Sequence, residues 1–258
     1  MSQDSQPSGP TFFDSNIWVG PPPEPTLRQF DKPEDLLAQM DRCGISGALV
    51  THFASLTYDW RDGNEMALEW AQHERLSAAV ALVPNSTGEV GGLGKYLDNV
   101  IARGARAVRL FPREHSFSLL PWCSGLMIEE IQARQLPLLL WHSECSWDQI
   151  DFVCRNWPGV SLILEGTGRK ILYDNRMFYQ LLSDHPSLYL ELHNLTNYLA
   201  VEDLVGRFGA SQLVYGSYMP ISDSGPAMAM VREARIADTD KELIARGNVE
   251  RLIEGVGK

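Results

Sequence analysis

Eight short apolar runs recur along the chain, and most of them alternate with stretches of helical periodicity. Runs rich in β-branched and aromatic residues are typical of buried strands. The expected strands are Phe12–Val19, Gly47–Phe53, Leu76–Pro84, Ala105–Pro112, Leu136–Glu144, Val160–Gly168, Leu188–Leu195 and Leu213–Pro220. Eight strands are the number that closes a parallel barrel.

Four helices are expected between these strands, and the alternation predicts an α/β fold with a parallel sheet. One helix, Lys32–Cys43, should be opened by Asp31 and stopped by Gly44. The others are Gly63–His73, Leu93–Arg103 and Gly125–Arg134. We expect a (β/α)8 TIM barrel, with a doubly wound open sheet as the alternative.

The length of 258 residues, 44% of them hydrophobic, suits one barrel domain. No internal repeat or interdomain linker is visible. We therefore expect a barrel over residues 11–258 and a flexible N-terminal tail over residues 1–10. The tail is polar and lacks the basic and apolar regions of a signal peptide.

The composition narrows the possible partners. A formal charge of −11 without any Lys/Arg run argues against nucleic acid and against anionic membranes. No apolar run is long enough to cross a bilayer, so a cytoplasmic location is expected. The spacing of the four cysteines predicts free thiols. A small-molecule substrate or ligand is the expected partner.

Polar side chains gather where the strands end. In a barrel the active site lies at the carboxyl ends of the strands, so these residues are the site candidates. They are Asp14, Asn16, Trp18, Thr51, His52, Arg109, His142, Glu144, Glu165, Glu191, His193, Ser217 and Tyr218. His73, His115 and His185 are expected at the surface instead.

Five segments, in order along nearly the whole chain, resemble the amidohydrolase-related family. Phe13–Trp18 resembles the opening Asp and His-x-His motif, and Leu136–His142 the strand that ends in a central His. Val160–Gly168 is similar to the strand that ends in a second such His. Val214–Pro220 resembles the Gly-Ser-Asp-x-Pro turn, and Ile244–Leu252 the closing helix with its Gly-Asn pair.

The departures from this pattern concern the metal ligands. Asn16 and Trp18 stand where the resemblance implies paired histidines, Gly166 where it implies the second strand-end His, and Tyr218 where it implies the catalytic Asp. Only His142 remains. An indole, a glycine and one imidazole cannot supply the several ligands that a catalytic zinc needs. We therefore predict no bound metal at the usual position and no cofactor.

His142 is the leading catalytic candidate because it follows a buried strand, with Glu144 two residues on and expected to point the same way. Its alternative is a structural histidine. Arg109 should face the barrel mouth, where it would bind a substrate carboxylate or form an ion pair with Glu191 or Asp14. Glu165 has the opposite strand parity from Gly166 and is expected to face the helices.

Glu191 and His193 share one face of their strand and would form either an acid/base pair or a structural hydrogen bond. Asp14 is expected to face the interior, as a site residue or as an acceptor from loop backbone. Trp18 and Tyr218 would stack on a flat substrate or fill the space of the missing metal. Asn16 is counted among the substrate-binding residues.

These residues suggest a metal-independent hydrolase of a small carboxylate-bearing ester, lactone or amide, a variant that the resemblance permits. His142 would activate water, Arg109 would anchor the carboxylate, Tyr218 would stabilise the oxyanion, and Glu191 and His193 would relay protons.

Two alternatives remain, a catalytically degenerate barrel that binds a ligand or a partner subunit, and a decarboxylase-like lyase. By analogy with other barrels, a homodimer is possible. An open mouth lined by His142, Arg109 and Glu191 would favour catalysis, whereas a mouth plugged by Trp18 and Tyr218 would favour the degenerate barrel.

Overall fold

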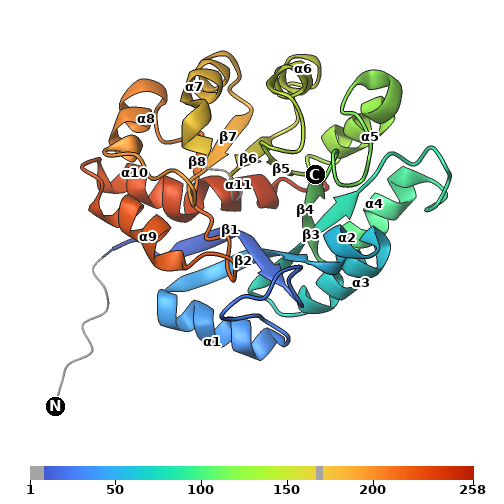
Figure 1. Cartoon of the computed structure of the whole chain (residues 1–258), viewed down its shortest axis with the longest axis horizontal. Coiled ribbons are helices and arrows are strands. Elements are labelled where there is room, and N and C mark those ends of the chain that lie inside the picture. Colours follow the sequence, from blue (N-terminus) through green and yellow to red (C-terminus); the bar gives the residue numbers. More distant parts are fainter. Residues whose placement is uncertain (1–8, 167–170) are drawn as a thin grey trace.

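Eight parallel strands form one sheet in strict sequence order, which confirms the expected barrel and excludes a doubly wound sheet, whose strand order would reverse. The computed structural model describes residues 9–166 and 171–258. The strands are β1 (Phe12–Val19), β2 (Ile45–His52), β3 (Leu76–Leu82), β4 (Ala105–Leu110), β5 (Leu138–Trp141), β6 (Leu162–Glu165), β7 (Leu188–Glu191) and β8 (Leu213–Val214). Figure 1 shows them enclosed by the helices.

The barrel closes between its first and last strands. Ile17 forms a parallel bridge with Met219, just beyond β8. The backbone N–H of Trp18 donates to the carbonyl of Met219 at 2.7 Å, and that of Tyr218 donates to the carbonyl of Asn16 at 2.9 Å. The segment after β8 therefore completes the seam, and it brings two of the candidate site positions side by side.

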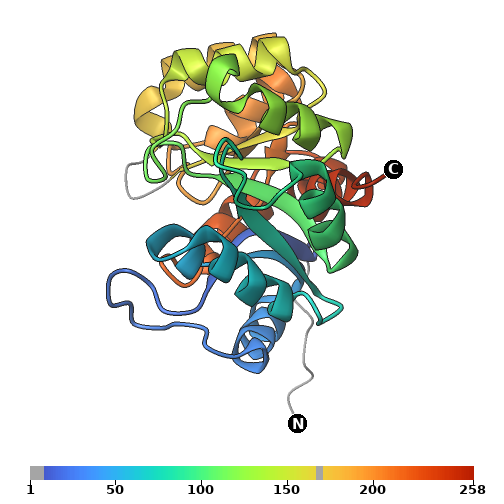
Figure 2. The same cartoon turned by 90° about the vertical axis from the view of Figure 1, so that its right-hand side faces the viewer.

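The helices form the outer layer (Figure 2). They are α1 (Pro33–Cys43), α2 (Ala54–Thr57), α3 (Trp60–Trp70), α4 (Leu93–Ala102), α5 (Pro121–Ala133), α6 (Trp147–Asn156), η1 (Ile171–Asp174), α7 (Asn175–Asp184), α8 (Ala200–Phe208), α9 (Ser224–Glu233), α10 (Asp238–Glu242), η2 (Leu243–Gly247) and α11 (Asn248–Glu254).

The start signals of two helices differ from the sequence expectation. Gly44 ends α1 in the left-handed conformation, as expected, with φ 76°. Asp31, however, does not cap this helix, because Lys32 is the N-cap and Pro33 opens the first turn. Helix α3 begins earlier than expected, because Asp59 accepts hydrogen bonds from its first backbone N–H groups.

Strands β5 to β8 are shorter than the apolar runs that predicted them, so the polar residues that follow belong to loops at the carboxyl end. The last two residues of the expected strand Val160–Gly168 lie outside the described residues. The same holds for residues 1–8 of the expected tail.

Free thiols were correctly expected, since all four cysteines are unpaired. Over residues 9–166 and 171–258, no helix combines the length and hydropathy needed to span a bilayer.

An apolar layer fills the barrel interior toward the amino ends of the strands, and each strand contributes one side chain to it. Val249 from α11 joins this layer, with Leu252 and Ile253 packed against it, so the C-terminal helix covers the amino end of the barrel. The strand residues of this layer are Phe13, Leu49, Ala79, Ala107, Leu139, Ile163, Tyr189 and Val214.

Two glycines in the outer helices, one closely packed and one facing open space, test how tightly these helices pack. A Cβ at Gly63 in α3 would lie 2.1 Å from the backbone N of Ser55, whereas one at Gly206 in α8 would meet nothing within 4 Å. We expect Gly63→Ala to destabilise the protein by about 1–3 kcal/mol, because the neighbour is backbone and must move. Gly206→Ala should stabilise it by about 0.5–1 kcal/mol. Urea unfolding measures both, and equal effects would contradict the packing described.

Candidate active site

A polar layer lies directly above the apolar one, toward the carboxyl ends of the strands. Side chains on a strand face the same side at every second residue, so each interior position is two residues beyond a member of the apolar layer. In four consecutive strands this rule places Arg109, Trp141, Glu165 and Glu191 inside the barrel.

Arg109 is the centre of the polar layer. Its guanidinium forms a bidentate ion pair with Glu165, with Nη2 donating to Oε1 at 3.0 Å, and the two side chains are 1% and 0% exposed. Nε donates to Thr51 Oγ1 at 3.1 Å, and Nη2 also to Asn16 Oδ1 at 3.3 Å. The guanidinium lies 5.0 Å from the centre of the Trp18 ring. One side chain thereby ties four strands together.

Glu165 shows where the sequence interpretation was wrong. Its parity was taken from Gly166, but Ile163 belongs to the interior layer, so Glu165 faces inward two residues later. Burial raises its pKa to about 7, although the charge of Arg109 acts in the opposite direction. The ion pair expected between Arg109 and Glu191 or Asp14 is thus made with Glu165 instead.

Glu191 and His193 form the second charged unit. The carboxylate accepts from the His193 backbone N–H at 2.7 Å and contacts the imidazole Nδ1. Burial lowers the pKa of His193, but the charge and hydrogen bond of Glu191 outweigh it and raise this pKa above its usual value. Within the described residues, Nε2 is buried without a hydrogen-bond partner. Gly216 makes room, because a Cβ there would lie 2.6 Å from Glu191 Oε1.

Tyr218 covers His193. Its ring centre lies 4.8 Å from that of the imidazole, with 35° between the planes. Its backbone is left-handed, with φ 59°, and the side chain is partly exposed. Burial raises the pKa of the phenol to about 12, so Tyr218 is a hydrogen-bond donor at neutral pH.

Asp14 is fully buried and holds the barrel seam. It accepts from the backbone N–H of Asn16 at 3.0 Å and from that of Ser217 at 2.9 Å. Burial raises its pKa to about 6. This is the alternative in which Asp14 binds loop backbone, and its substrate-binding role stays a prediction.

Trp18 is completely buried in an aromatic cluster. Its ring centre is 4.8 Å from Phe53, 5.2 Å from Trp141 and 6.0 Å from Phe111. The indole Nε1 donates to Asn16 Oδ1 at 3.0 Å. Trp18 therefore fills the interior rather than offering a free stacking face, and Asn16 is committed to Trp18 and Arg109.

His142 and Glu144 do not share one face of the site. His142 Nδ1 lies 3.1 Å from the Glu165 carbonyl oxygen, and Nε2 lies 3.8 Å from Asp174 Oδ2. Glu144 instead accepts two successive backbone N–H groups of the β4–α5 loop, each at 3.1 Å. The two side chains contact different partners, because both residues lie in the turn beyond the end of β5, where strand alternation no longer sets their direction.

The remaining histidines lie apart from this layer. His185, expected at the surface, is only 7% exposed and its Nε2 is 2.8 Å from Asp151 Oδ1. His52 is also buried, and its Nδ1 accepts from the Ala54 backbone at 3.1 Å. Throughout residues 9–166 and 171–258, no three His, Cys, Asp or Glu side chains are grouped so that they could hold a metal ion.

The two charged units are covered in different ways, since Arg109 is 1% exposed beside Trp18 and the ring above His193 is that of the partly exposed Tyr218. The aromatic cluster around Trp18 covers Arg109, which is already bound by Glu165. The Glu191–His193 pair lies instead under the partly exposed Tyr218. The pKa values of Asp14 and Glu165 are raised to about 6 and about 7, and that of His193 is raised above its usual value. Such displaced values, at the functional end of a barrel, are typical of sites for proton transfer.

The Arg109–Glu165 pair predicts an asymmetric cost of mutation. Glu165→Met leaves a buried guanidinium that cannot lose its proton, so we expect a loss of about 3–5 kcal/mol at pH 8, where Glu165 of the wild type is ionised. Arg109→Met leaves a carboxyl that can stay protonated. Its cost should be smaller at pH 6 and grow toward pH 8, because a raised folded pKa makes an acid destabilising as pH rises above its unfolded value.

Urea unfolding of both single variants at pH 6 and pH 8 checks this asymmetry. The double variant Arg109→Met/Glu165→Met should be more stable than Glu165→Met alone, because no charge is left buried. A larger cost for Arg109→Met than for Glu165→Met at pH 6 would contradict the assignment.

Comparison with known proteins gives similarity in structure only. No protein-family model and no curated protein matches the sequence. Solved structures match over nearly the whole chain. A protein assigned as a 2-pyrone-4,6-dicarboxylic acid hydrolase from Pseudomonas putida has a TM-score of 0.69 and 18% identity, covering 95% of this chain and 98% of that one.

Two further structures are similar to this chain in fold at equally low sequence identity. A 5-carboxyvanillate decarboxylase from Sphingomonas paucimobilis has a TM-score of 0.71 and 12% identity, covering 94% of this chain and 98% of its own. An amidohydrolase II protein has a TM-score of 0.70 and 14% identity, covering 94% and 99%. At these identities the likeness is one of fold: the chain is a (β/α)8 barrel, and it is similar in structure to amidohydrolase-like barrels that include hydrolases and decarboxylases.

Proposed function

We propose that this barrel is a metal-independent hydrolase of a small carboxylate-bearing ester, lactone or amide. The observation that carries the proposal is the buried Glu191–His193 pair at the carboxyl end of the barrel, whose imidazole ring lies beneath Tyr218 and whose Nε2 has no hydrogen-bond partner among the described residues. Proteins with similar folds include the 2-pyrone-4,6-dicarboxylic acid hydrolase, whose name describes hydrolysis of a ring that carries two carboxyl groups.

The donor set around the centre supports a reaction without a metal ion. Asn16 offers its Oδ1 to Trp18 and Arg109. An indole nitrogen is a donor only. At Gly166 no side chain fits, because a Cβ there would lie 2.5 Å from the Cβ of Asn194. These residues do not fit a divalent ion, so we derive no step through one.

His193 is the proposed base in place of His142. With its proton on Nδ1 and shared with Glu191, the imidazole has Nε2 available to take a proton from water as the water oxygen attacks the substrate carbonyl carbon. Glu191 stabilises the imidazolium that forms. Tyr218 donates to the carbonyl oxygen as it becomes negative. The imidazolium then returns its proton to the leaving oxygen or nitrogen as the carbonyl bond to that atom breaks.

A barrel that binds a ligand without turning it over is the second candidate. The burial of Trp18 in its aromatic cluster and the complete pairing of Arg109 favour it, because both groups are closed to a substrate. The buried charges of Arg109, Glu165 and Glu191 favour an enzyme instead. A buried ion pair is often no more stabilising than apolar residues of the same size, so charge held here suggests chemistry.

A panel of carboxylate-bearing lactones and aryl esters tests the proposal. His193→Ala should lower kcat by about 100-fold or more, because it removes the base. His73→Ala is the matched control, since His73 lies in the turn between α3 and β3 at the opposite end of the barrel. His142→Ala should have a smaller effect than His193→Ala. Wild-type rates no higher than background would favour the ligand-binding alternative.

The pH dependence gives an independent check of the base. His193 acts when deprotonated, and its pKa is raised, so kcat/KM should increase with pH through a value above that of ordinary histidine. Glu191→Gln removes the main group that raises this pKa. The midpoint of the rate profile should therefore move to lower pH, with a lower plateau. An unmoved midpoint would show that His193 is not the titrating base.

A further inference from the structure

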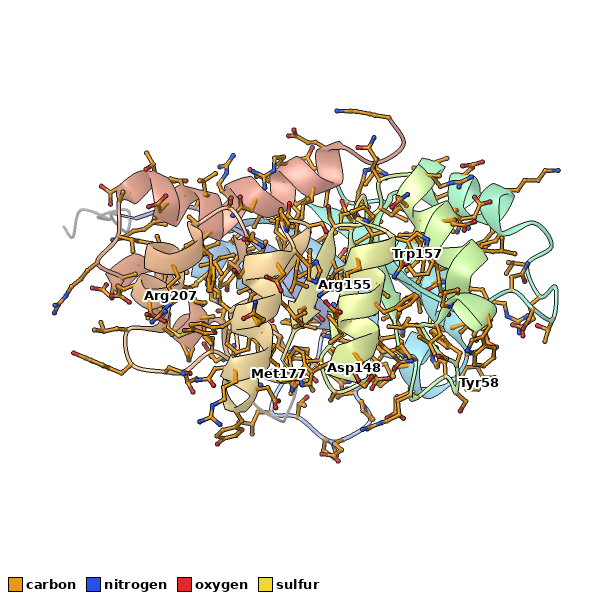
Figure 3. The ribbon with its side chains drawn as sticks, turned by 90° about the horizontal axis from the view of Figure 1, so that it is seen from above. Tyr58, Asp148, Arg155, Trp157, Met177 and Arg207 are labelled. Carbon is orange, nitrogen blue, oxygen red and sulfur yellow. The ribbon has the colours of Figure 1, made fainter. Side chains whose placement is uncertain are left out.

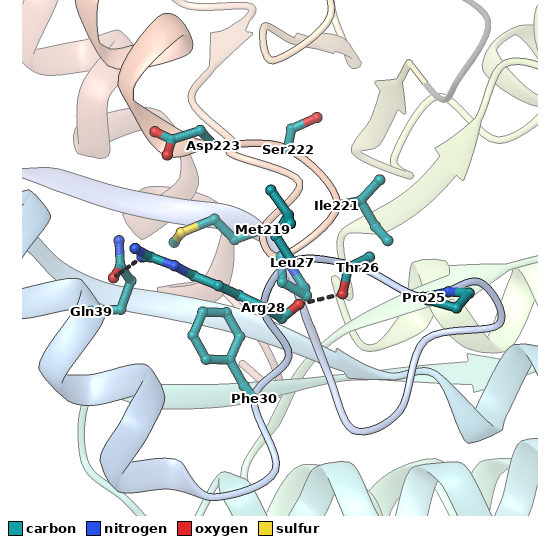
Figure 4. Close-up of a pocket in the computed structure, with 11 residues that line it drawn as sticks. Pro25, Thr26, Leu27, Arg28, Phe30, Gln39, Met219, Ile221, Ser222 and Asp223 are labelled. Carbon is teal, nitrogen blue, oxygen red and sulfur yellow. Dashed lines mark hydrogen bonds between the residues drawn. The ribbon is translucent and has the colours of Figure 1, made fainter.

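A cavity of about 440 Å³ lies at the carboxyl end of the barrel, beside the candidate active site. Its walls are the β1–α1 loop, with Leu27 and Arg28, and the β8–α9 loop, with Met219 and Ile221 (Figure 4). Tyr218 directly precedes Met219, so one short segment of chain borders both the cavity and the Glu191–His193 pair. The volume is in the range of cavities that bind small molecules.

One side of this cavity is cationic. Arg28 Nη1 donates to Gln39 Oε1 at 3.0 Å, and Arg42 donates to the same oxygen. Within residues 9–166 and 171–258, neither guanidinium forms an ion pair. Asp223, the carboxylate in the cavity wall, accepts from the Gly225 backbone as the cap of α9.

Two arginines that share one amide oxygen without an acidic partner among the described residues, Arg28 and Arg42, are unusual in a chain that has 33 acidic and 22 basic residues. Two guanidinium groups that converge on one amide oxygen repel each other unless an anion lies nearby. An incoming carboxylate would match the planar guanidinium of Arg28 and relieve this repulsion.

The other side of the cavity is apolar. Phe30 and Met219 are buried at 5% and 3% exposure, whereas Leu27 is fully exposed and Ile221 is 40% exposed. Large apolar side chains that line a cavity and are exposed to water are stabilised when a ligand covers them, at roughly 25 cal/mol for each Å² removed from water.

We propose that this cavity binds a small amphipathic carboxylate, with its carboxylate on Arg28 and its apolar body between Leu27 and Ile221. Arg109 cannot serve as this anchor, because Glu165 occupies its guanidinium. The proposal goes beyond the hydrolysis suggested above and does not need it, since binding is measured without turnover.

Calorimetric titration of the full chain with phenylacetate and with phenylacetamide tests the site. The two probes share the ring and differ in charge. We expect phenylacetate to bind at least tenfold more tightly than the amide, and Arg28→Gln to abolish this difference. Ile221→Ser should weaken both probes alike. Arg155→Gln is the matched control, because Arg155 is exposed on the outer helix α6 (Figure 3) and should leave both affinities unchanged.

Three results would overturn the proposal: no binding of phenylacetate, equal binding of both probes to the wild type, or the same loss from Arg155→Gln as from Arg28→Gln. The titration is repeated on His193→Ala, which should bind phenylacetate like the wild type. Unchanged binding there, with no hydrolysis of any substrate by the wild type, would sustain the carboxylate site and reject the catalytic proposal.

Discussion

The buried pair of Arg109 and Glu165 sets the arrangement of everything at the carboxyl end of the barrel. The guanidinium hydrogen-bonds to Glu165 in β6, Thr51 in β2 and Asn16 in β1. The single side chain of Arg109 therefore links three other strands to β4. Asn16 in turn holds the Trp18 indole. An arginine keeps its charge at every accessible pH, so the guanidinium stays a donor in all of these contacts. The pKa of Glu165 is raised to about 7, so its carboxylate is fully charged only above neutral pH.

The same pair has an electrostatic consequence for its neighbours. Two further carboxylates, Asp14 and Glu191, are buried close to it, and His193 adds a positive charge when it is protonated. Burial disfavours the charged form of Asp14, whereas Glu191 favours the charged form of the histidine. The proton transfer proposed for His193 depends on this balance between burial and neighbouring charge.

The fold could be predicted because eight apolar runs separated by helical stretches leave few ways to bury every strand. The site could be predicted only in part. The inward direction of Arg109 and the pairing of Glu191 with His193 followed from their positions at strand ends. Glu165 was among the candidates, but its orientation was wrong because its parity was assigned from a motif match at Gly166, when Ile163 already fixed the inward face. The cavity at Arg28 depends on two loops distant in sequence, and no local pattern reveals such a contact.

We propose that Arg109 takes the place of a metal ion in organising the interior of this barrel. Elemental analysis of protein purified without chelators tests it most directly. We expect zinc, manganese and iron each well below one equivalent per chain, with stability unchanged after treatment with EDTA. One equivalent of a divalent metal that copurifies with the protein, and whose removal destabilises the fold, would contradict it.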